Sequence, residues 1–223
     1  MIRTNIANYD PEIRVADTDT LIERLKASRY YATPVRLAIA VSLVHWNQKR
    51  LQGTPYLDNH VNAIAMMMAD LLDIIPTNTA FYKDRHELLS LALIHDVVED
   101  TPITHDNIKH LFGGTQMMAG SMALDKNLHA SKREYVENFA NVSPGAQFVK
   151  ILDRINNLLS PIHDQKFHDR YIHESFVLLV AVRTNPFAIL LAKAILKSEG
   201  GVLDEEEKRY LNRFLQITLE EDI

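Results

Sequence analysis

The chain has 223 residues, of which 47% are hydrophobic and 24% are charged, and its formal net charge at pH 7 is -5. This apolar content suffices for a sizeable core, and the length fits one domain over residues 1–223. The acidic balance argues against broad nucleic-acid binding, which needs a basic surface. The lack of cysteine excludes disulfides and thiolate zinc sites, and no amino-terminal apolar run indicates a signal peptide or a membrane span. We therefore expect a cytoplasmic chain whose partner is a small molecule, without nucleic-acid or membrane partners.

The first expected elements are helices within Ile13–Ser42, a stretch typical of a lead-in rather than of a separate unit. A turn at Gly53–Tyr56 follows. The next helix has apolar residues at helical spacing, namely Val61, Ile64, Ala65, Met68, Leu71 and Leu72. His60 falls in its first turn, and Asp58 or Asn59 is a suitable N-cap. A lone histidine there is more often a surface or capping residue than a metal ligand, so His60 needs support from elsewhere.

The strongest signal for chemistry is the sequence HDVVEDT, which follows the apolar segment Leu88–Ile94. Buried helices do not normally end in such polar residues. If the helix continues, His95 and Glu99 share one face, and Asp96 and Asp100 share the face beside it. The next residue is a proline, which should end the helix and leave the polar patch open to a cleft. The ordinary alternative is a solvated helix end.

A second apolar helical pattern, Lys150–Leu158, carries a polar face on which Asp153, Asn157 and Ser160 lie four and three residues apart. The chain then offers two imidazoles and two carboxylates for one site. They are His60, His95, Asp96 and Asp153. Such a mixed nitrogen and oxygen set suits a divalent transition ion that keeps an open position for water. The pattern therefore predicts a metal-dependent hydrolase.

The clearest break near the carboxyl end is Gly200-Gly201. Beyond it, apolar residues predict an amphipathic terminal helix, namely Leu203, Tyr210, Leu211, Phe214 and Leu215. This helix could dock on the rest of the chain or form a homo-oligomer.

Several motifs resemble, in the same order, the hydrolase domain of the RelA/SpoT family. They are His45–Arg50 followed by Gly53, Pro55 and Tyr56; His95–Thr101; Phe112-Gly113; Lys132–Tyr135; and Lys150–Asn157. The His-Asp pair alone is common to many phosphohydrolases, whereas the full HDVVEDT run is much narrower. The resemblance covers about residues 37–185 and implies an all-α fold, an HD-domain helical bundle. It implies an enzyme that removes pyrophosphate from the 3′ position of guanosine tetra- and pentaphosphate.

The resemblance also implies roles for individual residues. The metal, usually manganese, would be bound by His60, His95, Asp96 and Asp153. Glu99 and Asp100 would orient and deprotonate the attacking water. Arg50 would stack on guanine, Asn157 would contact the nucleoside, and Ser160 would lie near the substrate. The donor set itself also admits iron, cobalt or zinc.

The chain departs from the family pattern before its metal histidine. The family usually has two residues between the tyrosine and this histidine, followed by proline, whereas here three residues separate Tyr56 from His60 and Val61 follows. One extra residue can be absorbed in a turn without moving the helix. The chain also leaves no room for the synthetase domain of the long family members, so we expect a stand-alone alarmone hydrolase.

Other interpretations stay open from the sequence. The substrate could be another nucleotide, such as an adenine alarmone, a 3′-phosphorylated cofactor or a deoxynucleotide, and a non-catalytic nucleotide-binding fold is the more distant alternative. Arg50 by itself is an ordinary exposed arginine, and Tyr56 a partly buried aromatic without an assigned role. Lys150 and Arg154 could neutralise phosphates or flank a buried helix. The remaining polar-context histidines are expected to be solvated, namely His105, His110, His163, His168 and His173.

Overall fold

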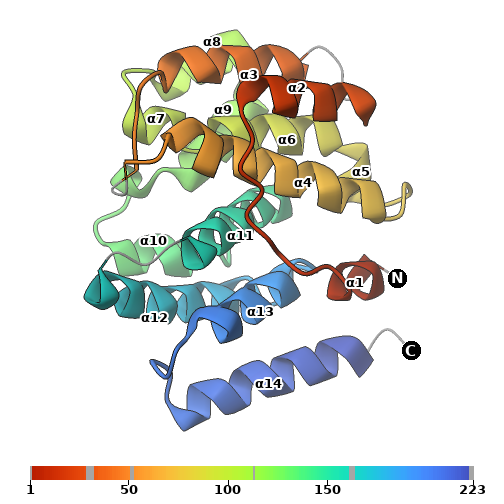
Figure 1. Cartoon of the computed structure of the whole chain (residues 1–223), viewed down its shortest axis with the longest axis vertical. Coiled ribbons are helices and arrows are strands. Elements are labelled where there is room, and N and C mark those ends of the chain that lie inside the picture. Colours follow the sequence, from red (N-terminus) through yellow and green to blue (C-terminus); the bar gives the residue numbers. More distant parts are fainter. Residues whose placement is uncertain (1, 29–32, 51–52, 113, 161–163, 221–223) are drawn as a thin grey trace.

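The computed structural model describes residues 2–28, 33–50, 53–112, 114–160 and 164–220, and these residues form a helical assembly (Figure 1). Within these ranges the structure has no β-strand, only an isolated antiparallel bridge between Lys49 and Pro55. The predicted all-α fold is confirmed. Gly113 of the Phe112-Gly113 motif and His163 lie outside the described residues.

The amino-terminal part of the chain contains α1 (Ile2–Ala7), α2 (Thr18–Ala27), α3 (Thr33–Val44), the π-helical turn η1 (Leu57–Val61), α4 (Asn62–Ile74), α5 (Ala80–Lys83), α6 (Arg85–Ile94) and α7 (Val97–Asp100). The remainder contains α8 (His105–Phe112), α9 (Gly114–Leu124), the 3₁₀ turn η2 (Lys126–Leu128), α10 (Lys132–Asn138), α11 (Pro144–Leu159), α12 (Gln165–Ala181), α13 (Ala188–Ser198) and α14 (Glu205–Glu220). The described part of the expected lead-in is helical over Thr18–Ala27 and again from Thr33.

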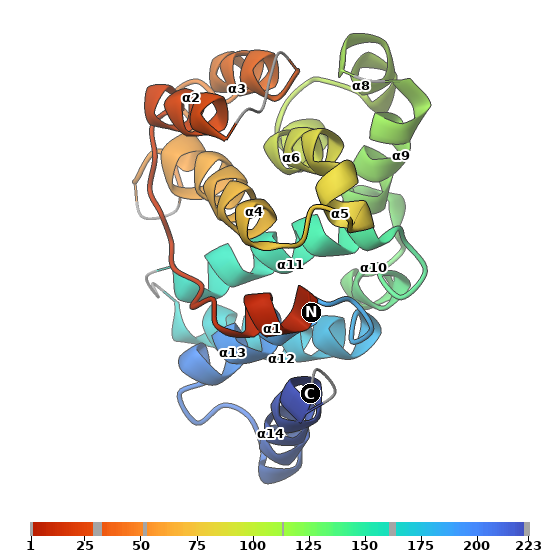
Figure 2. The same ribbon diagram turned by 90° about the vertical axis from the view of Figure 1, so that its right-hand side faces the viewer.

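Helix α11 is the central element of the fold. Figure 2 shows it crossing the molecule between α4 and α6 on one side and α12 and α13 on the other, and it packs against all four. Ser143 caps its start by accepting a hydrogen bond from the Ala146 amide, and Pro144 occupies the first turn, where no amide partner is required. Because neighbours surround α11, its polar residues Asp153 and Asn156 are carried into the interior.

The predicted buried helix over Leu88–Ile94 is confirmed as the apolar part of α6. Its continuation through the HDVVEDT run is wrong. His95 and Asp96 form a turn, and helical structure resumes only in α7, where Glu99 lies. The helix is therefore interrupted within the run, although the Asp100 amide still donates to the Asp96 carbonyl at 2.9 Å. The predicted end before the proline is confirmed, since Thr101 is extended, with φ −138 and ψ 168.

The predicted N-cap at Asp58 or Asn59 is also wrong. The chain is already helical at Leu57, in the π-helical turn η1, and the Asn59 side chain donates to the Pro55 carbonyl at 3.0 Å instead of capping. A π-turn closes over one residue more than an α-turn, and such turns often occur at functional sites. This turn therefore absorbs the extra residue between Tyr56 and His60 while α4 continues directly from it.

The predicted terminal helix is α14, at the opposite end of the molecule from α2 and α3 (Figure 1). It packs on α13 and α1 and buries Leu211, while Leu203 is buried in the preceding loop. In the described part of the chain, no helix combines the length and the apolar character that a membrane crossing requires.

An aromatic cluster joins three helical segments, and its loss should have a large effect on stability. Phe148 of α11 stacks on Phe187 with ring centroids 3.5 Å apart, and Phe81 of α5 meets both rings edge-on. We expect Phe148→Ala to lower the free energy of unfolding by about 3–5 kcal/mol, because it leaves a cavity in a fully buried position. Urea denaturation measures this. Phe167→Ala, at a position 45% exposed, is the matched control and should cost much less.

Candidate functional site

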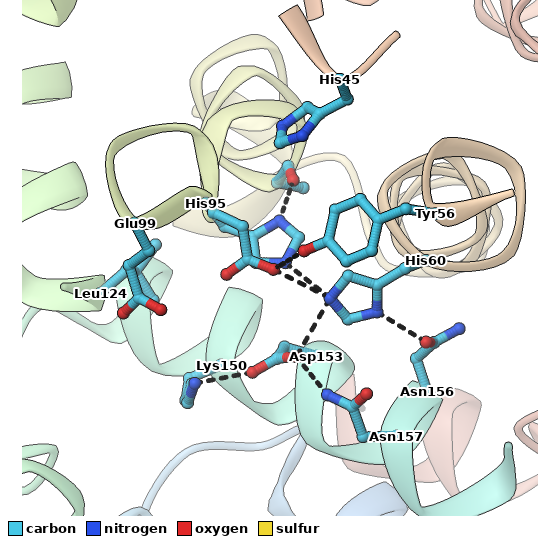
Figure 3. Close-up of polar contacts among 12 residues, drawn as sticks. His45, Tyr56, His60, His95, Glu99, Leu124, Lys150, Asp153, Asn156 and Asn157 are labelled. Carbon is cyan, nitrogen blue, oxygen red and sulfur yellow. Dashed lines mark hydrogen bonds and ion pairs between the residues drawn. The ribbon is translucent and has the colours of Figure 1, made fainter. Parts of the chain in front are cut away.

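Three of the predicted ligands meet at one point in the structure. His60 comes from the π-helical turn η1, and His95 and Asp96 come from the turn after α6. Their Nε2 and carboxylate atoms lie within 4.8 Å of one another. Figure 3 shows the two imidazoles together. The two Nε2 atoms are 3.2 Å apart, and Asp96 Oδ2 lies 3.0 Å from His60 Nε2 and 3.1 Å from His95 Nε2. Two distant segments thus present their donor atoms to a common centre.

Each imidazole has its other nitrogen fixed by a hydrogen bond. His95 Nδ1 donates to the Ala92 carbonyl at 2.7 Å, and His60 Nδ1 donates to the Asn156 side-chain oxygen at 2.8 Å. Both acceptors lack a proton to give, so both Nδ1 atoms must carry one. In the neutral rings, the Nε2 lone pairs therefore face the common centre. This is the arrangement typical of histidine metal ligands.

The fourth predicted ligand, Asp153, approaches the same centre from α11. Its Oδ1 lies 3.5 Å from His60 Nε2, which is farther than the Asp96 contacts. Its Oδ2 is held by the Lys150 ammonium at 2.6 Å, and both side chains are largely buried. Lys150, itself a residue of α11, is therefore the ion-pair partner of a predicted ligand.

The pKa values reflect this crowding of charged groups. Burial lowers the pKa of His95, but the carboxylates of Asp96 and Asp153 raise it more, to about 9. Burial raises the pKa of Asp96, whereas both histidines lower it, and the balance is well below its ordinary value. For Asp153 burial again raises the pKa, and the Lys150 ammonium contributes most to lowering it to about 2. The carboxylates at the centre therefore stabilise a positive charge placed between them and the imidazoles.

The donor set fits a divalent cation. Two Nε2 lone pairs and a carboxylate oxygen converge on one point, with a second carboxylate nearby. At these distances the electron-rich atoms repel one another unless a proton or a cation lies between them. The raised pKa of His95 expresses the preference for a proton, which a metal ion must displace on binding. The side chain of Asp96 remains 18% exposed, so solvent reaches the centre from that side.

Tyr56, which has no role assigned from the sequence, lies against this centre. Its hydroxyl donates to Asp96 Oδ2, and Figure 3 shows its ring beside His60. Burial, followed by the charges of Asp96 and Asp100, raises the pKa of Tyr56 far above its ordinary value, so the phenol stays protonated and acts as a donor. Tyr56 thus fixes the orientation of the Asp96 carboxylate.

Glu99 lies beside the centre, across from His60 (Figure 3). Its Oε1 accepts a hydrogen bond from the Lys126 amide at 2.7 Å, and its Oε2 pairs with the Lys126 ammonium. Its side chain is only 8% exposed, whereas Asp100 is exposed and lies on the side of Tyr56. Of the two carboxylates predicted to orient and deprotonate the water, Glu99 is therefore fixed by hydrogen bonds and Asp100 is exposed.

The residues predicted to bind substrate lie near the centre but bind one another. The Arg50 guanidinium donates to Asn156 Oδ1 at 2.9 Å and to Asn157 Oδ1 at 2.7 Å. Asn157 Nδ2 donates to Asp153 Oδ1 at 2.7 Å, as the four-residue spacing on α11 predicts. Ser160, just beyond the end of α11, is buried and donates to the Asn156 carbonyl.

Two further residues stand out only in the structure. Asn156 is fully buried and accepts from both His60 and Arg50, yet in the sequence it is merely the neighbour of Asn157. His45 is buried with its Nδ1 bonded to Gln48, and its Nε2 has no partner among the described residues. The expectation of solvated histidines is wrong for His168, which is buried in α12, and for His105, which contacts Ser121 and Asp125.

Comparisons with known proteins show what the chain is similar to. No family model matches the chain. The mouse protein named guanosine-3′,5′-bis(diphosphate) 3′-pyrophosphohydrolase MESH1 is 34% identical over 122 residues, which is 51% of this chain and 61% of that protein. The bifunctional (p)ppGpp synthase/hydrolase SpoT of Escherichia coli K12 is 32% identical over 123 residues, which is 51% of this chain and 16% of SpoT. The matched part of this chain therefore spans less than two thirds of either relative.

A solved structure is also similar over most of the chain. It is described as "A metazoan ortholog of SpoT hydrolyzes ppGpp and plays a role in starvation responses", and it superposes with a TM-score of 0.62 at 26% identity. The match covers 78% of this chain and 98% of that chain. The expected resemblance is confirmed from both directions: the chain is similar to proteins named MESH1 and SpoT in sequence, and it has the all-α, HD-domain fold of the solved SpoT ortholog.

Proposed function

We propose that the protein is a metal-dependent hydrolase that adds water to the 3′-pyrophosphate of guanosine tetra- or pentaphosphate, giving GDP or GTP and pyrophosphate. One observation carries the proposal: two Nε2 lone pairs and the Asp96 carboxylate converge on one point in a chain whose relatives are named for this reaction. A nucleotide substrate, a cytoplasmic location and a role in starvation signalling belong to the same proposal.

The metal would be held by His60, His95 and Asp96, which meet at the centre, and by Asp153, whose Oδ1 lies 3.5 Å from His60 Nε2. The nitrogen and oxygen donors admit several divalent transition ions, and we propose manganese. When bound, such an ion supplies Lewis-acid activation of water and of a phosphoryl oxygen. Tyr56 supports the site by holding Asp96 in place through its hydroxyl.

Glu99 would accept the proton of the attacking water. Its place in α7, after the turn that carries His95 and Asp96, and its low exposure support this role. The Lys126 amide and ammonium fix both carboxylate oxygens, so the group is oriented before substrate arrives. Asp100, exposed on the side of Tyr56, would orient the water from there.

The nucleoside would lie beside Arg50, Asn157 and Ser160. The hydrogen bonds of Arg50 to the two asparagines lie in the plane of its guanidinium, so they do not use the faces on which a base would stack. The Asn157 amide donates to Asp153 Oδ1 at 2.7 Å, and this closeness to the proposed metal site supports a role for Asn157 in contacting the nucleoside.

The test is manganese-dependent release of pyrophosphate from guanosine tetraphosphate by the full chain. We expect release that depends on added Mn²⁺ and disappears in Asp96→Ala, because this carboxylate contacts both histidines. The adenine analogue and simple nucleotides, assayed in parallel, report the base preference. Faster turnover of the adenine analogue would contradict the guanosine assignment, and no release with any divalent ion would contradict the hydrolase itself.

A further inference from the structure

Arg50 makes an unusual pair of contacts with two consecutive asparagines of α11. Its Nη1 donates to Asn156 Oδ1 at 2.9 Å and its Nη2 donates to Asn157 Oδ1 at 2.7 Å. Consecutive residues of a helix point about 100° apart, so few single side chains can bind both. The guanidinium can, because its two terminal nitrogens form a planar fork.

Each asparagine is also hydrogen-bonded to a different predicted metal ligand. Asn156 Oδ1 also accepts from His60 Nδ1 at 2.8 Å, and Asn157 Nδ2 donates to Asp153 Oδ1 at 2.7 Å (Figure 3). His60 and Asp153 come from different elements, η1 and α11. Arg50 is thus the one described side chain that donates to both asparagines and so connects to both ligands.

The π-helical turn joins the same network through its backbone. The Asn59 carbonyl accepts from the Asn156 amide at 3.1 Å and from Arg50 Nη1 at 3.4 Å. The Asn156 side chain, fully buried, therefore has its oxygen bonded twice and its amide bonded once. Loss of the guanidinium would remove one donor from each asparagine oxygen and leave each side chain held by fewer hydrogen bonds, so both would be less firmly oriented.

We propose that Arg50 is a positioning residue for the metal centre: through Asn156 and Asn157 it sets the orientation of the His60 ring and of the Asp153 carboxylate. The inference rests on the proposed metal-dependent function and adds to the expected contact of Arg50 with the base. Outer partners of metal ligands fix the tautomer and direction of the ligand, and their loss commonly weakens metal binding 10- to 100-fold.

The experiment measures Mn²⁺ affinity in the absence of nucleotide, by titration calorimetry of the full-length protein and by the electron paramagnetic resonance signal of bound Mn²⁺. We expect Arg50→Lys to weaken Mn²⁺ binding by about 10- to 100-fold, since an ammonium cannot bind both asparagine oxygens in one plane. Arg209→Lys in α14, at the far end of the molecule, is the matched control and should keep wild-type affinity.

A second variant separates positioning from a general loss of structure. Asn156→Asp keeps an acceptor for His60 Nδ1 and for Arg50, whereas Asn156→Leu removes it, so Mn²⁺ affinity should survive far better in the first. Thermal unfolding of the metal-free variants confirms that each is folded.

Unchanged Mn²⁺ affinity in Arg50→Lys, with a raised KM for guanosine tetraphosphate, would overturn the proposal and leave Arg50 as a substrate contact alone. Failure of wild-type protein to bind any divalent ion would overturn it as well. If wild-type protein binds Mn²⁺ but releases no pyrophosphate, the proposed function fails while the affinity comparison still decides the role of Arg50.

Discussion

Asp153→Ala should abolish tight Mn²⁺ binding and also destabilise the metal-free protein. Asp153 supplies one of the four predicted ligand groups, and it is the ion-pair partner of Lys150, whose ammonium lies 2.6 Å away in a largely buried position. Removal of one member of a buried pair leaves the other charge without compensation, at a cost of about 3–5 kcal/mol. The two losses have different causes and can be separated.

The separation uses a second substitution. In the double variant Asp153→Ala/Lys150→Met no unpaired ammonium remains, so the free energy of unfolding in urea should recover most of the loss while Mn²⁺ binding stays absent. Lys150→Met alone keeps all four predicted ligands and should still bind Mn²⁺. Wild-type Mn²⁺ affinity in Asp153→Ala would show that this residue is not a metal ligand. Equal stability of the single and double variants would show that the unpaired Lys150 ammonium does not cause the loss of stability.

The sequence predicted those parts of the site that depend on short-range periodicity. The buried helix before His95 followed from its apolar run, and the contact between Asp153 and Asn157 followed from their spacing of four on one helix. The contact between His60 and His95 was predicted from the types of their side chains, because two imidazoles and two carboxylates together are a donor set that suits a divalent metal ion.

The helix break at His95 could not be predicted in the same way. Every residue of the HDVVEDT run is compatible with a helix, and the departure is small, with φ −106 and ψ −1 at Asp96. What fixes Asp96 there is tertiary: its carboxylate binds His60 Nε2 and the Tyr56 hydroxyl, both from another part of the chain. A local pattern contains no information about such partners.

The same reason explains why Asn156 and the bonds of Arg50 were missed. Arg50 and Asn156 are far apart in the sequence, and only the packing of η1 on α11 brings them together. The amphipathic pattern of α11 placed Asn157 on the polar face and gave Asn156 no function. A fully buried asparagine at the next position has a partner that only the assembled fold supplies.

Glu99→Gln should lower turnover of guanosine tetraphosphate by about 10²-fold or more while leaving Mn²⁺ affinity unchanged, because a general base contributes on that order. Glutamine keeps the length of the side chain and an oxygen that can accept from the Lys126 amide, but its amide cannot take a proton from water. Glu99 lies in α7, after the turn that carries His95 and Asp96, and its carboxylate pairs with Lys126 rather than with either histidine.

Rate and affinity must be measured on the same preparations, with Glu137→Gln, exposed on α10, as the matched control. Parallel loss of Mn²⁺ binding and turnover in Glu99→Gln would make Glu99 a ligand instead of the base. Unchanged turnover would move the role to Asp100, and Asp100→Asn would then show the large loss. Because Glu99 is held on both oxygens whereas Asp100 is exposed, we expect the larger decrease from Glu99, since a general base acts best when its geometry is fixed before the water is attacked.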